Sequence, residues 1–112
     1  MREHMFESGL RPKRDMAGVF EYDGETGYFY LCNLTKPNGQ QVVGAIQIAS
    51  GALDFLPSDI NIAWNHANTV VGLFIRGRMW AAFDASGDRY GGNYQPGRQP
   101  QLPQEIAAGF QN

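Results

Sequence analysis

The run from Gly18 to Leu34, GVFEYDGETGYFYLCNL, constrains the fold more than any other part of the chain. Its two halves carry aromatic side chains in strand-like alternation, and the Asp23-Gly24 pair between them tolerates the positive φ of a tight turn. The run therefore predicts two antiparallel strands joined as a hairpin. Both faces of residues 27–34 are largely apolar, which predicts a strand covered on both sides.

Four later segments also show the pattern of apolar side chains that is typical of strands, namely residues 41–50, 60–66, 69–75 and 78–83. In one of them Ile60, Ile62 and Trp64 share a face, so we expect Trp64 to lie in the core. The Arg76-Gly77 pair predicts a second two-residue hairpin turn.

The chain ends in a different pattern. Leu102, Ile106 and Phe110 recur at four-residue spacing, which predicts a short C-terminal helix starting near Pro103. We therefore expect a mainly β protein, α+β at most. Its architecture would be an antiparallel meander of about six strands, forming a sandwich or partial barrel with one short C-terminal helix.

Length and composition indicate one domain. A chain of 112 residues can bury a core of its own, and its 14 glycines and 6 prolines indicate many turns. Residues 1–15 are polar and lack periodicity, so they predict a flexible arm, with a short edge segment as an alternative. Residues 16–112 would form the single β-rich domain.

Charge and cysteine content limit the classes of partner and compartment. The net charge is −2, with 9 basic against 11 acidic residues, which argues against capture of nucleic acid. The chain has no apolar run near the length of about 20 residues that spans a bilayer, so no membrane partner is expected. Cys32 is the lone cysteine and the first residues lack the apolar centre of a signal peptide. The cytoplasm is the expected location.

No catalytic, cofactor or metal site is predicted. Residues 84–88 place oxygen side chains at alternate positions, as a calcium loop does, but Arg89 and Gln95 stand where such a loop needs Gly and Glu. A polar turn explains the segment better. The acidic residues of the first hairpin, Glu21, Asp23 and Glu25, are expected at a wet tip that does not favour general acid work.

A nucleophile and base pair of Cys32 with His66 is the other chemical candidate. Cys32 lies in an apolar strand, where cysteine usually behaves as a small core residue with a raised pKa. The interpretation as core is therefore favoured, and no cofactor is expected.

Three segments, VFEYDGETGYFY at 19–30, Ile62-Ala63-Trp64 and IRGRMWAAFD at 75–84, resemble a family of small bacterial domains of unknown function. Its members share an FEDDGETGYFYAL-like hairpin and a later W-x-x-D-G…L-I-N-G…A-V-F-D pattern. The likeness spans roughly residues 16–84. Tyr22 stands where the pattern has an acidic residue, which weakens any role for a paired acidic cluster, and Arg76 stands where it has Asn. The resemblance implies a compact bacterial domain and brings no activity or site residues.

Many aromatic residues and no catalytic constellation favour a non-enzymatic protein-interaction module, either a homodimer or the inhibitory partner of another bacterial protein. The alternative is a small-molecule-binding or catalytic domain with an aromatic-lined pocket. The candidate residues for an interaction surface or pocket are Tyr28, Tyr30, Arg76, Arg78, Trp80 and His66.

Overall fold

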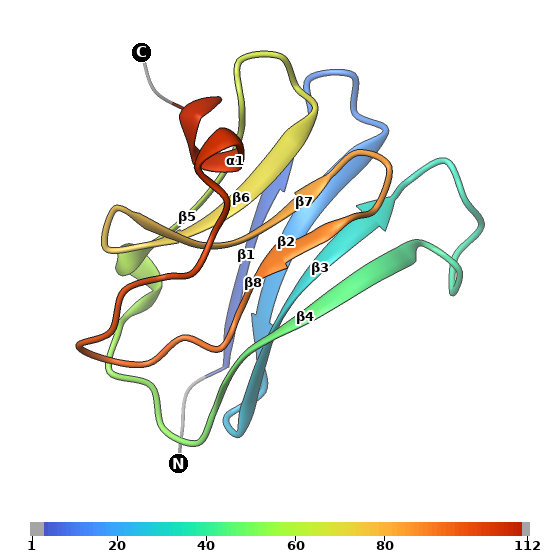
Figure 1. The fold of residues 1–112 in the computed structure, drawn as a ribbon. Coiled ribbons are helices and arrows are strands. Elements are labelled where there is room, and N and C mark those ends of the chain that lie inside the picture. The colour runs from blue at the N-terminus through green and yellow to red at the C-terminus, as the bar shows by residue number, and fades with distance from the viewer. Residues whose placement is uncertain (1–3, 111–112) are drawn as a thin grey trace.

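Eight strands form two four-stranded antiparallel sheets in the computed structural model, which describes residues 4–110 (Figure 1). The first sheet consists, in spatial order, of β1 (Met5–Leu10), β2 (Met16–Tyr22), β3 (Thr26–Asn33) and β4 (Val42–Ser50). The second consists of β5 (Ile60–Trp64), β6 (Val70–Ile75), β7 (Arg78–Asp84) and β8 (Arg89–Gly91). A short 3-10 turn, η1 (Pro57–Asp59), precedes β5, and a helix, α1 (Gln104–Ala108), follows the last strand.

The two sheets face each other across one core that their inward side chains form together. Alternation places Phe20 of β2 and Phe29 of β3 on the inner face of the first sheet, and both are fully buried. Phe83 of β7 comes from the second sheet, and its ring centroid lies 5.3 Å from that of Phe29. Because burying one large apolar side chain contributes about 1.5–3 kcal/mol, these rings are a main source of stability.

Hydrogen bonds bridge the sheets along both sides of the sandwich. Next to β1, the indole Nε1 of Trp64 donates to the carbonyl oxygen of Gly9 over 3.1 Å. Next to β4, the backbone N–H of Tyr94 donates to the carbonyl oxygen of Ile48 over 2.7 Å. No ladder closes the β1 and β5 side among the described residues, so the architecture is a bridged sandwich and not a closed barrel.

Both tight turns form where the sequence predicts them. The Asp23 carboxylate accepts the backbone N–H groups of Glu25 and Thr26 at 2.8 Å each, and these bonds, led by that from Thr26, hold the pKa of Asp23 below its usual value. Arg76 and Gly77 both adopt positive φ, of 52° and 81°, as a type I′ turn requires. The Asp23 carboxylate therefore serves turn structure.

The fold class is confirmed as mainly β, whereas the expected count of about six strands is wrong. The two additional strands are β1 and β8. β8 has only three residues in a glycine-rich polar stretch, and β1 mixes Glu7, Ser8 and Gly9 with apolar residues. Neither segment has a clear two-residue period, so pairing with a neighbouring strand decides its conformation.

The segment of residues 1–15 has a defined structure where it is described. Its residues 5–10 form β1, which pairs with β2 along its whole length, and residues 1–3 of the expected arm lie outside the described residues. The Arg11 guanidinium donates to both carboxylate oxygens of Asp15, at 2.9 and 2.6 Å, and lies over the Trp64 ring. These contacts place β1 and its turn against the second sheet.

The predicted C-terminal helix is present as α1 and covers the outer face of the second sheet (Figure 1). Leu102, Ile106 and Phe110 all pack there, and the Phe110 ring meets that of Phe74 edge-on at 5.3 Å. Among the described residues, no helix is long and apolar enough to cross a bilayer.

We predict that Gly9→Ala destabilises the protein by about 1–3 kcal/mol, because the added Cβ would lie 2.7 Å from the backbone oxygen of Ile62. Ser8→Ala is the matched control, since Ser8 is the neighbouring exposed residue of the same strand and should change stability by less than about 0.5 kcal/mol. Urea unfolding measures both. Equal stability of the two variants would contradict the close approach of β1 to β5.

Candidate functional site

The outer face of the first sheet carries apolar side chains that no element fully covers. Phe6 is 66% exposed, Leu10 44% and Val43 41%. Alternation along each strand turns these side chains away from the core, because their neighbours Met5 and Gly44 point inward. We call this surface the open face; it consists of Phe6, Ser8, Leu10, Ala17, Val19, Glu21, Tyr28, Tyr30, Cys32, Val42, Val43, Ala45 and Gln47.

Tyr28 and Tyr30 lie at the centre of the open face. Their rings stack at 5.8 Å between centroids with an interplanar angle of 16°. Both side chains are partly exposed, so the expectation that strand 27–34 is covered on both sides is wrong for this face. Cys32 continues the same row, and partial burial raises the pKa of its thiol. The row is suited to contact with another apolar surface.

The open face is almost uncharged. Among its residues only Glu21 carries a formal charge, and it lies opposite Tyr28 in the strand register. Apolar and aromatic side chains with few charges are typical of the buried centre of protein interfaces. The arrangement can therefore bury against another protein surface without leaving many unpaired charges.

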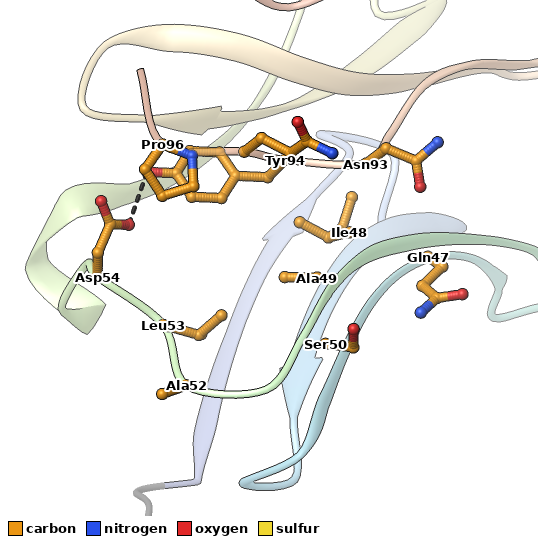
Figure 2. Close-up of a pocket in the computed structure, with 11 residues that line it drawn as sticks. Gln47, Ile48, Ala49, Ser50, Ala52, Leu53, Asp54, Asn93, Tyr94 and Pro96 are labelled. Atoms are coloured by element: carbon orange, nitrogen blue, oxygen red, sulfur yellow. Dashed lines mark hydrogen bonds between the residues drawn. The ribbon is translucent and has the colours of Figure 1, made fainter. Parts of the chain in front are cut away.

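A second candidate site lies beneath the irregular segment of residues 92–101, which we call the strap. On one side of the strap is a cleft of about 430 Å³ between β4, the loop before η1 and Tyr94 (Figure 2). The Tyr94 hydroxyl donates to the Asp54 carboxylate over 2.7 Å. Burial, together with this bond and the charge of Asp54, raises the pKa of Tyr94 to about 12. The bond ties the strap to the loop before η1.

On its other side, the strap borders an arginine-lined cleft of about 330 Å³. Its walls consist of Ile75, Arg76, Arg78, Trp80, Tyr94, Gln95, Gly97, Arg98 and Gln99. The Trp80 indole is 5% exposed and meets the Tyr94 ring edge-on at 4.7 Å. Tyr94 borders both clefts, whereas Trp80 lines only the arginine-lined one of the two. The arginine-lined cleft combines cationic, amide and aromatic groups.

The six residues singled out from the sequence fall in three places. Tyr28 and Tyr30 lie on the open face, whereas Arg76, Arg78 and Trp80 line the arginine-lined cleft. His66 is exposed in the turn between β5 and β6, where its backbone N–H donates to the carbonyl oxygen of Gly109 over 3.4 Å.

Cys32 lies in β3 of the first sheet, whereas His66 lies in the turn between β5 and β6 of the second sheet, which gives no support to a nucleophile and base pair. Among the described residues, no group of three His, Cys, Asp or Glu side chains gathers in a way that would hold a metal ion. At the proposed calcium loop, the Asp84 carboxylate accepts bonds from Ser86, Asp88 and Tyr90, so it supports a polar turn.

Sequence reasoning missed the contribution of the strap. Tyr94, Arg98 and Gln99 lie in a stretch without strand or helix periodicity, and only the alternation of glutamine with proline, glycine and arginine marks it. These side chains become part of a cleft because the strap folds back over β7. Nothing local in the sequence specifies that return.

Comparison with known proteins gives one match. A family model described as "Uncharacterized protein conserved in bacteria (DUF2251)" matches residues 2–100. No curated protein and no solved structure matches the chain. The resemblance to a bacterial family of unknown function is thereby confirmed.

We predict that Tyr94 keeps its proton to a pH of about 12 in the folded protein, whereas an unfolded tyrosine releases it near pH 10. The folded state then binds more protons between these values, so the free energy of unfolding should fall as pH rises from about 10 to about 12. Tyrosinate absorbance of the wild type minus that of Tyr94→Phe measures the titration.

Asp54→Asn is the accompanying variant. It removes the charged acceptor, so the midpoint of Tyr94 should move down towards 10. A folded wild-type midpoint near 10 would contradict the bond between Tyr94 and Asp54.

Proposed function

The chain belongs to this family of uncharacterised bacterial proteins, and we propose that it acts as a non-enzymatic interaction module that associates with a second copy of itself through the open face. The observation that carries the proposal is the difference between the two outer faces. The chain covers its second sheet with α1 and the residues around it, but leaves the aromatic face of its first sheet exposed. Exposed apolar patches of this kind mark interaction sites.

A second copy suits this face better than a charged partner. The single carboxylate of Glu21 offers little for a complementary charged surface to recognise, whereas a second copy presents the same row of aromatic and aliphatic groups. Two-fold dimers that bury one self-complementary patch are the commonest protein assemblies. The edges of the sheets are bridged by other contacts, so face-to-face packing is favoured over edge pairing.

The size of the open face sets the expected strength of self-association. Four strands about 4.8 Å apart and about seven residues long present a flat area of about 400–450 Å² per copy. This is less than the roughly 800 Å² that each partner of a stable complex buries, so we propose a reversible, concentration-dependent dimer. The proposal includes a cytoplasmic setting, because a lone thiol is compatible with a reducing compartment.

The alternative of an aromatic-lined small-molecule pocket has weaker support as the main function. Trp80 is nearly inaccessible, and polar groups make up much of the lining of both clefts beside the strap. The arginine-lined cleft nevertheless has a charge pattern of its own.

We predict that Phe6→Lys and Val43→Lys each weaken self-association by about tenfold or more, because dimerisation would bury an unpaired ammonium group. Both positions are exposed, so the monomer should remain folded. Leu56→Lys is the matched control, since Leu56 is an exposed apolar residue (62%) outside the open face. Sedimentation over a wide concentration series measures the dissociation constants.

Labelling of Cys32 by a maleimide gives a second measurement. The thiol lies on the open face, so its labelling should slow as the wild-type concentration rises and should not slow in Val43→Lys. A wild type that stays monomeric throughout the series, or an equal effect of Leu56→Lys, would contradict self-association through this face.

A further inference from the structure

The arginine-lined cleft holds more positive charge than its own carboxylates neutralise. Arg76 already has anionic partners. Its guanidinium lies 3.4 Å from the Asp54 carboxylate and 3.6 Å from the Asp59 carboxylate. It also donates to the backbone carbonyl oxygen of Asp54. Within residues 4–110, neither Arg78 nor Arg98 makes an ion pair. Two guanidinium groups in one cleft are thus without an anionic partner.

Arg78 is instead hydrogen-bonded to a neutral group of the strap. The Arg78 guanidinium donates to the side-chain oxygen of Gln99 over 2.6 Å. The amide oxygen of Gln99 carries no formal charge, so it offers Arg78 a hydrogen bond but no ion pair, whereas an anionic oxygen would offer both. The strap has no regular secondary structure here, so Gln99 can turn aside and leave the Arg78 fork to an anion. Gln99 thus stands where a ligand oxygen would lie.

From this geometry we propose that the arginine-lined cleft binds a small organic phosphate monoester, with its phosphate held between Arg78 and Arg98. A phosphate monoester carries close to two negative charges at neutral pH and three acceptor oxygens, which matches two guanidinium groups that have no ion-pair partner among the described residues. The cleft of about 330 Å³ has room for a small organic group beside the phosphate. The partly exposed Tyr94 ring provides the apolar contact for that group.

This site is separate from the open face and does not depend on it. The cleft is formed by β7 and the strap, and the open face is formed by β1–β4. Ligand binding and self-association can therefore be tested independently.

Titration calorimetry with phenyl phosphate and, separately, with inorganic phosphate tests the proposal. We expect phenyl phosphate to bind the wild type, and the double variant Arg78→Gln/Arg98→Gln to lose about tenfold or more in affinity, because both charged forks are replaced by neutral amides. Lys36→Gln, which removes one positive charge from the exposed loop between β3 and β4, should keep wild-type affinity. Equal affinity of the double variant and the wild type, or no binding to the wild type, would overturn the site.

The two probes distinguish an ester from free phosphate. Tighter binding of phenyl phosphate than of inorganic phosphate supports the ester, and equal or tighter binding of inorganic phosphate would overturn the organic part of the proposal. Changes in the amide and guanidinium NMR chemical shifts of the wild type on addition of phenyl phosphate locate the binding site without any substitution. Shifts centred on Arg78, Arg98 and Gln99 support the cleft, and shifts centred on other basic residues would overturn it.

Discussion

The contact between Phe29 and Phe83 across the core is the interaction on which the rest of the structure depends. Each ring comes from a different sheet, both are fully buried, and their centroids are 5.3 Å apart. β4 can pass beside Phe83 because it carries Gly44 there, where a Cβ would lie 2.7 Å from the ring atom Cε1. This close packing brings β4 within reach of the chain that follows β8, so the Tyr94 N–H can bond to Ile48 and start the strap.

The two outer faces differ in what the described residues pack against them. After β8 the chain still has the strap and α1, and Leu102, Ile106 and Phe110 cover the outer face of the second sheet. Within residues 4–110 no element covers the outer face of the first sheet in this way, and Tyr28 and Tyr30 stay partly exposed there. The chain thus covers the outer face of the second sheet with its own residues and leaves the outer face of the first sheet exposed. The interaction proposal therefore rests on the open face.

The two proposed sites use opposite chemistry and different parts of the chain. The open face is nearly uncharged and is built on regular strands, which suits contact with a protein surface of similar character. The arginine-lined cleft places guanidinium groups against an irregular strap, which suits a small anion that the strap can adjust to. A rigid sandwich supports both, since β7 carries Arg78 and Trp80 on the same framework that positions β2 and β3.

The sequence alone determined the elements whose signals are local: the hairpin at Asp23-Gly24, the turn at Arg76-Gly77, the shared face of Tyr28 and Tyr30, and the short helix after Pro103. Tertiary structure decided the rest. β1 and β8 form because neighbouring strands pair with them, and Trp80 is buried because Tyr94 returns over it. Which face stays open, and which arginines meet in one cleft, depends on contacts between residues far apart in the chain. Local periodicity reports a residue's own conformation and does not report what will later pack against it.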